Sequence, residues 1–192
     1  IPLLGISIIA YEEPKLEKVT FDSLRVIAVL KVEQIENWLD ERRDDGQTLA
    51  RDPSFLDLVV RMQRGDSAAG RSLRQRLNAF RDAYGYHATT MLGADGEYLV
   101  HAGVRHEITE ADREQALRLA HDYDRKSFSL YTDDEGHTYI DFVVPLTGRE
   151  AAQKLTGALL LHIEPEKFLF PYIHRWPAED GSGESLLVRR VG

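Results

Sequence analysis

Apolar positions in the first quarter of the chain follow the three-and-four spacing of one face of a helix. At about 1.5 Å per residue, an unbroken helix from residue 15 to about residue 52 would exceed roughly 50 Å, which suits a stalk or a signalling strut. The alternative is two shorter helices that separate near residues 20–22, where Thr20 or Asp22 could act as an N-cap. The apolar positions are Leu16, Val19, Leu24, Ile27, Leu30, Ile35, Trp38 and Leu39.

Residues 1–11 show a different pattern, because they are almost wholly apolar until Glu12 and Glu13 interrupt them. A membrane-spanning helix needs about 20 apolar residues, so this segment could not cross a bilayer alone. One interpretation is the outer end of a membrane helix. The other is a buried strand, which the β-branched run "ISII" would favour.

Two further helical patterns cover residues 55–62 and 72–84, and extended patterns follow them. The segment "YHATTMLGADGEYLVHAG" predicts a hairpin that turns at residues 94–96, because Asp-Gly supplies the positive φ of a tight turn. The segment "SFSLYTDDEGHTYIDFVVPL" predicts a second hairpin that turns at residues 134–136, and "LTGALLLHIEP" predicts a fifth strand.

Between the two hairpins, a capping box of Thr109 and Asp112 begins a short helix, and residues 166–176 predict another short helix or turn. Two hairpins, a helical connection and a fifth strand can close one antiparallel sheet. The order therefore predicts an α+β fold, with a long N-terminal helix packed on a five-stranded antiparallel, PAS-like sheet.

The composition excludes several functions. With 32 acidic and 24 basic residues the net charge is −8, so sequence-independent binding to nucleic-acid phosphates is not expected. The absence of cysteine rules out disulfides and thiolate nucleophiles. The seven histidines lack metal-binding spacing, and neither a G-x-S-x-G motif nor a phosphate-binding glycine loop is present. We therefore expect no metal and no cofactor. No motif in the sequence indicates a hydrolase with a Ser, His and Asp triad.

Four phrases, "KVEQIENWLDERRDD", "IDFVVPL", "GALLLHIEPEKFLFPYIHRWP" and "GESLLVRR", together with the first hairpin, resemble the sensor region of bacterial transmembrane receptors with the double Cache fold, also called PDC sensors. The likeness covers residues 21–190 and lies in element order and short apolar phrases. Such regions precede histidine kinase, diguanylate cyclase or methyl-accepting modules. The resemblance implies a non-catalytic sensing domain on the periplasmic or extracellular side of the inner membrane, within a parent signalling enzyme.

The resemblance also implies a domain organisation. Residues 1–11 would be the outer end of a membrane helix, residues 12–52 a helical strut, residues 53–177 the membrane-distal sensor module and residues 178–192 the start of a second module. Alternatively, the strand predicted in "ESLLVRRVG" packs elsewhere in a one-module variant. Long helices from two subunits could pair, which would make a homodimer.

Candidate ligand-binding residues lie on the predicted sheet. In a regular hairpin, Thr89 and His101 share one face with His87, and they could grip a carboxylate or a hydroxyl. The alternative, preferred for His87, is that this face is simply exposed to solvent. Arg105, in the loop before the connecting helix, could reach over a pocket, although charged loops are mostly solvated.

Asp141 is the most informative single residue, because it interrupts an apolar strand and a buried carboxylate without a partner is costly. Its partner could be a ligand ammonium group, or instead Arg125, Lys126 or a cluster of backbone N–H groups. Tyr131 and Tyr139 offer hydroxyls to the same region.

Three functions are compatible with these patterns. The first is a sensor that binds a small organic solute of the amino-acid or carboxylate class and signals through its long helix. The second is a ligand-free structural or dimerisation module of a membrane receptor. The third is a cytoplasmic enzyme, which predicts a deep polar cleft with a strongly perturbed ionisable group.

Overall fold

The computed structural model describes residues 2–104, 108–123, 127–132, 136–147 and 155–174. The predicted helices and the five predicted strands of the sheet are present among these residues, whereas the strand predicted in "ESLLVRRVG" lies outside them. The long helix is continuous, so a break near residues 20–22 and a strand within residues 2–11 are both wrong. The elements are α1 (Pro2–Arg51), α2 (Pro53–Gln63), α3 (Ser67–Tyr84), β1 (Ala88–Gly93), β2 (Tyr98–Gly103), α4 (Glu110–His121), β3 (Phe128–Thr132), β4 (Thr138–Thr147), β5 (Leu155–Ile163) and α5 (Pro165–His174).

The described residues divide into two compact units, one within residues 39–168 and the other of residues 2–38 together with residues 169–174. In the second unit, the Lys31 ammonium donates a hydrogen bond of 2.8 Å to the Ile173 carbonyl. Large apolar side chains of α1, among them Phe21, Val26 and Val32, are exposed there. Within the part of the chain that is described, no helix has a stretch both long and apolar enough to cross a membrane.

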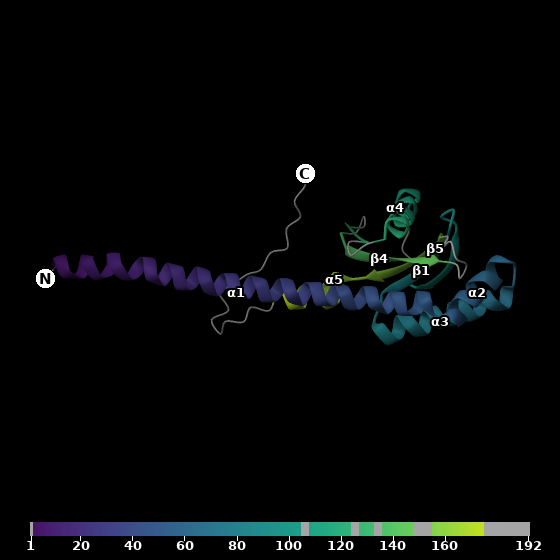
Figure 1. Cartoon of the computed structure of the whole chain (residues 1–192), viewed down its shortest axis with the longest axis horizontal. Helices are drawn as coiled ribbons and strands as arrows, with labels where there is room; N and C mark the ends of the chain where they lie inside the picture. Colours follow the sequence, from purple (N-terminus) through teal and green to yellow (C-terminus); the bar gives the residue numbers. More distant parts are fainter. Residues whose placement is uncertain (1, 105–107, 124–126, 133–135, 148–154, 175–192) are drawn as a thin grey trace. The chain divides into compact units, whose positions relative to one another are not determined.

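The larger unit contains a sheet with the strand order β2-β1-β5-β4-β3, antiparallel at every pairing. Helix α4 covers one face and α3 the other, and we call these the α4 face and the α3 face (Figure 1). Ala116 and Ala120 of α4 pack on Leu92, Val143 and Leu160 of the α4 face. Every residue of β1 is buried, as expected for a strand covered on both faces.

The first hairpin contains a β-bulge that the sequence does not reveal. Gly96 turns the hairpin at a φ of 83°, as predicted. Beyond the turn, Leu92 pairs with Tyr98 but Met91 pairs with Val100, so Leu99 is the extra residue. Because side chains alternate along a strand, one extra residue exchanges the faces of the rest of β2 relative to β1.

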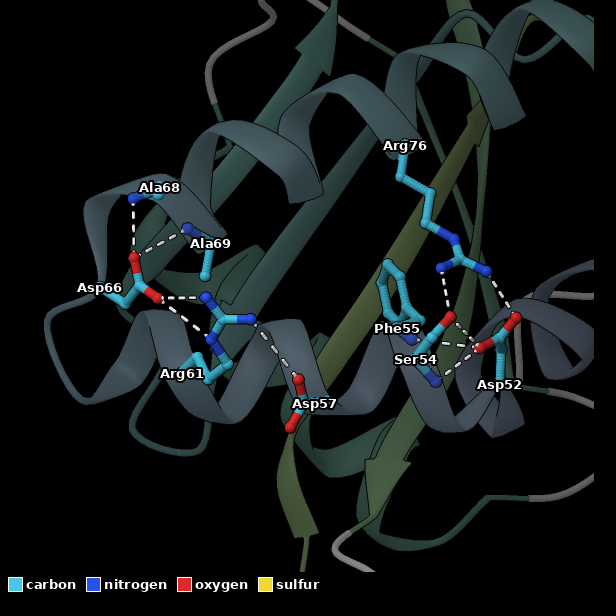
Figure 2. Close-up of polar contacts among 9 residues, drawn as sticks. All are labelled: Asp52, Ser54, Phe55, Asp57, Arg61, Asp66, Ala68, Ala69 and Arg76. Carbon is cyan, nitrogen blue, oxygen red and sulfur yellow. Dashed lines mark hydrogen bonds and ion pairs between the residues drawn. The ribbon is translucent and has the colours of Figure 1, made fainter.

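Aspartates cap the two helices that precede the sheet (Figure 2). The Asp52 carboxylate begins α2 by accepting hydrogen bonds from the backbone N–H of Ser54 at 2.7 Å and of Phe55 at 3.2 Å. Arg76 of α3 pairs with the other oxygen of Asp52 and donates to the Ser54 hydroxyl. Asp66 caps α3 in the same way, by accepting hydrogen bonds from the backbone N–H of Ala68 and Ala69.

The Asp52 cap predicts a stability change in acid. Hydrogen bonds from the Ser54 hydroxyl and the backbone, with Arg76 nearby, lower the pKa of Asp52 from 3.8 to about 2. A lowered folded-state pKa gives stability that is present above the unfolded-state pKa and is lost as the pH falls from about 4 through about 2. Asp52→Asn keeps the cap but loses the charge. Its urea midpoint should lie below that of the unmodified protein at neutral pH, and the gap should close in acid. Asp57→Asn, at an exposed carboxylate, is the control, and equal gaps at both pH values would contradict the expectation.

Candidate functional site

A chain of four hydrogen-bonded side chains crosses the α4 face, and we call it the polar chain. The His162 Nδ1 lies 2.6 Å from Asp141 Oδ1, and His162 Nε2 lies 2.8 Å from Thr90 Oγ1. Thr90 Oγ1 also lies 2.9 Å from His101 Nδ1. The polar chain therefore extends from β4 through β5 and β1 to the edge strand β2.

Strand register places these four residues on one face. Asp141 lies directly opposite His162 in the β4–β5 pair, and Thr90 lies directly opposite His101 in the β1–β2 pair. His162 is opposite Ala88, two residues from Thr90, which is the diagonal relation that lets side chains touch. Thr90 and His162 are fully buried and Asp141 is 5% exposed. Groups of this polarity are stable at such depth only because they bind one another.

Asp141 also lines a small cavity between α4 and the sheet. Its floor is apolar, from Val143 and Leu160, and α4 supplies Asp112 and Gln115 at its rim. The cavity volume is about 10 Å³, the space of a single water molecule. An apolar floor with a few convergent polar groups is typical of a small-molecule site. The volume of this cavity, however, admits only water. The remaining lining residues are Ile108, Ala116 and Ser129.

The distances from Thr90 through His162 to Asp141 match those of a hydroxyl, imidazole and carboxylate triad. Catalysis by such a triad needs a hydroxyl that can reach a substrate. Thr90 is fully buried in the sheet, and its oxygen contacts two imidazoles. The arrangement therefore satisfies buried polar groups of the sheet and places Asp141 in the wall of the cavity, and it does not present a nucleophile.

A second ionisable pair lies at the end of β5. His87 Nδ1 is 2.9 Å from Glu164 Oε1, and the His87 ring stands 5.6 Å from that of Tyr139. Burial lowers the pKa of His87, against the raising effect of Glu164. The predicted solvent exposure of His87 is wrong, because its side chain is only 11% exposed.

The described structure supplies a partner for Asp141 that the sequence did not suggest. This partner is His162, whereas Arg125 and Lys126 lie outside the described residues. Tyr139 is on the same face as Asp141 and is buried. Tyr131 is opposite Tyr139 in the backbone register, and Arg105 lies outside the described residues.

Thr89 and His101 do not share a face, so that prediction is wrong. The bulge at Leu99 pairs Thr89 with Ala102 and Thr90 with His101. Thr89 consequently points into the core of the α3 face, fully buried, and its hydroxyl has no hydrogen-bond partner among the described residues. His101 joins the polar chain instead.

Sequence reasoning missed Thr90, His162 and Asp112. A histidine inside "LLLHIEP" was a usable signal, because it interrupts a buried strand as Asp141 interrupts another. Two buried polar residues on neighbouring strands satisfy each other where the register brings them together. Asp112 was recognised only as part of the capping box, which the structure confirms.

A larger hollow of about 270 Å³ lies outside the sheet, beside the turn of the first hairpin. It is lined mainly by charged residues of that turn and of α4, including Glu97, Glu110 and Arg113. Leu117 is the one large apolar side chain among the described residues that line it, so this lining lacks the apolar floor of the small cavity.

No family model matches the sequence, and no curated protein matches it. Solved structures do match the fold. The extracellular domain of vpHK1S-Z8, assigned as a histidine kinase, is similar with a TM-score of 0.62 and 14% identity over 83% of this chain and 64% of that chain. The ligand-binding domain of the Campylobacter jejuni chemoreceptor Tlp3, in complex with 4-methylisoleucine, is similar with a TM-score of 0.59 and 12% identity over 77% and 59%.

A third similar structure is the sensor domain of the Vibrio cholerae histidine kinase DctB, with a TM-score of 0.54 and 11% identity over 77% of this chain and 57% of that chain. The chain thus spans roughly three fifths of the domains it matches. At these identities the likeness is one of fold. The fold is that of the PDC or Cache sensor domains, as the sequence phrases predicted, with a long N-terminal helix and a five-stranded antiparallel sheet.

Proposed function

We propose that this chain is the extracytoplasmic sensing domain of a bacterial transmembrane receptor, of the histidine kinase or diguanylate cyclase type. It binds a small organic solute of the amino-acid or carboxylate class between α4 and the sheet. In this proposal residues 1–11 continue into a membrane helix, and residues 178–192 begin a second module. The domain itself is not catalytic, and its output enzyme lies elsewhere in the parent protein.

The observation that carries this proposal is the cavity under α4. It has an apolar floor of Val143 and Leu160, with Asp141 on the sheet and Asp112 on the covering helix. Two carboxylates at an apolar cavity suit a ligand with an ammonium group, because an opposite charge offsets their desolvation. The C. jejuni relative was solved with 4-methylisoleucine, which is a ligand of this class.

The small size of the cavity shapes the mechanism. A volume of about 10 Å³ cannot hold an amino acid, so binding requires α4 to move away from the sheet. The ligand then stabilises the open arrangement by its differential affinity for it. Movement of α4 or the sheet would reach α1, whose paired copies in a homodimer would transmit it.

Thermal unfolding with panels of amino acids, carboxylates and amines tests the proposal. A ligand at a hundredfold excess over its dissociation constant should stabilise the chain by about 2.7 kcal/mol. Asp141→Asn should abolish the shift for amines, because it removes the carboxylate, and Asp57→Asn, far from the cavity lining, should retain it. If no compound of the three panels stabilises the chain against thermal unfolding, the proposal is wrong.

The second candidate is a ligand-free structural or dimerisation module. The cavity volume favours it, since a closed α4 face needs no ligand for its stability. It predicts silence in the ligand panels together with a concentration-dependent dimer. The ligand panels distinguish the two candidates from each other. Sedimentation of the chain over a range of concentrations tests the dimer.

A further inference from the structure

A side-chain hydrogen bond joins the C-terminal end of α4 to α1. The amide of Gln47 donates to the Tyr123 hydroxyl oxygen at 2.9 Å, although the two residues are 76 positions apart. Tyr123 is the second residue beyond α4, and the intervening Asp122 closes the helix by donating its backbone N–H to the Arg118 carbonyl at 3.0 Å. The bond therefore lies directly at the end of the helix that covers the cavity.

The stretch of α1 that makes this bond belongs to the larger unit and packs on the α3 face. Gly46, the neighbour of Gln47, comes so close to the sheet that a Cβ atom there would lie 2.5 Å from Val144 Cγ2. Leu49, two residues beyond Gln47, is buried. Since α4 packs on the opposite face, the hydrogen bond connects helices that cover the two faces of one sheet.

The two ends of α4 are held differently. At the C-terminal end, the Leu119 carbonyl accepts from the Ser127 hydroxyl at 3.3 Å, and the Ser127 carbonyl accepts from the Val143 N–H at 2.9 Å. The N-terminal half lines the cavity through Asp112 and Gln115. Among the described residues, the polar side chains of this half form hydrogen bonds only within the helix and its cap. These bonds favour opening of the cavity by a pivot of α4 about its C-terminal end.

We propose that Tyr123 couples α4 to the helical strut, so that a pivot of α4 is transmitted to α1 through the hydrogen bond with Gln47. The coupling deepens the proposed function and rests on it for the ligand that drives the pivot. The Tyr123 hydroxyl moves with the end of α4, whereas the absence of space around Gly46 prevents α1 from moving closer to the sheet. A displaced hydroxyl therefore either pulls Gln47 or releases it, and both results change the last turns of α1.

The surroundings of Tyr123 keep this contact uncharged. Burial raises the pKa of Tyr123, against the lowering effects of the Gln47 hydrogen bond and of the Arg43 and Arg51 charges. The two arginines lie one helical turn on either side of Gln47, on the same side of α1. Because the phenol is neutral at physiological pH, Tyr123→Phe removes one hydrogen bond and no charge.

Hydrogen exchange of backbone amides tests the coupling on the full chain without ligand, so a negative result in the ligand panels does not affect it. Ala116→Leu takes the place of a ligand, because Ala116 is 4% exposed and lines the cavity, so a leucine there pushes the N-terminal half of α4 away from the sheet. It should accelerate exchange at residues 44–51 of α1 roughly two- to tenfold relative to α3. Tyr123→Phe should remove most of this acceleration, and Tyr84→Phe, at an exposed tyrosine of α3, should retain it.

Gln47→Ala and Tyr123→Phe provide a second measurement if Ala116→Leu does not fold. Because both remove the same hydrogen bond, each should accelerate exchange at residues 116–121 of α4 by a similar factor, and the double variant should exceed neither. Thr48→Ala, at an exposed neighbour on α1, should leave α4 unchanged. The coupling is wrong if Ala116→Leu leaves α1 unchanged, if it acts equally with and without the Tyr123 hydroxyl, or if the effects of Gln47→Ala and Tyr123→Phe add.

Discussion

Replacing Thr90 by valine is expected to destabilise the larger unit by about 3 kcal/mol, whereas the same change at Thr89 should stabilise it by up to about 1 kcal/mol. The two threonines are neighbours on β1, and both are fully buried. Valine has nearly the same shape as threonine, so packing changes little. The difference comes from the hydroxyls, because that of Thr90 lies 2.8 Å from His162 and 2.9 Å from His101.

Thr90→Val leaves two imidazole nitrogens without the hydroxyl that they share, and a buried polar group that loses its partner costs about 1–3 kcal/mol. The Thr89 hydroxyl lacks a partner among the described residues, so its removal relieves a desolvation cost instead. Urea unfolding of the two variants measures both effects. Equal changes in the two would mean that the polar chain does not hold the sheet together.

The elements of this fold are predictable from the sequence because their signals are local. The periodicity of α1, the Asp-Gly turn that places Gly96 at positive φ, and the capping box at Thr109 each depend on residues within a few positions of one another. The antiparallel sheet follows from the order of hairpins. All of these were confirmed.

The site was only partly predictable, because it depends on register. A single bulge at Leu99 exchanged the faces of Thr89 and His101 relative to a regular hairpin. The pairing of Asp141 with His162 depends on how β4 and β5 align, and the connection between them does not fix that alignment from sequence. The sequence shows that an ionisable residue interrupts an apolar strand. Its partner depends on how that strand aligns with its neighbour, which residues far apart in the sequence determine.

Gly46 of α1 predicts a second large effect, at the contact between that helix and the α3 face of the sheet. A Cβ atom at Gly46 would lie 2.5 Å from Val144 Cγ2 and 3.0 Å from Leu161 Cδ1. Both side chains are buried, and the β-branched Val144 has little freedom to turn away. Alanine in a helix is favoured over glycine by about 1 kcal/mol, yet overpacking of about 1–3 kcal/mol should exceed that gain.

Gly46→Ala should therefore lower the free energy of unfolding by up to about 2 kcal/mol. Gly70→Ala on α3 is the matched control, because its Cβ would lie 3.4 Å from the flexible side chain of Met62, and there the helix preference should raise stability. Val144→Ala makes room for the new methyl group, so the double variant should lose less than the sum of the two single losses, by about 1 kcal/mol or more.

Urea unfolding of the four variants measures this coupling. If Gly46→Ala behaves like Gly70→Ala, α1 does not approach Val144 closely in solution. If the coupling is found, the Gly46 contact is a rigid junction between sheet and strut. A rigid junction matters for the proposed sensor, because a shift of β4 at Asp141 would displace Val144, three residues along the same strand, and Val144 cannot move toward α1 without moving the helix.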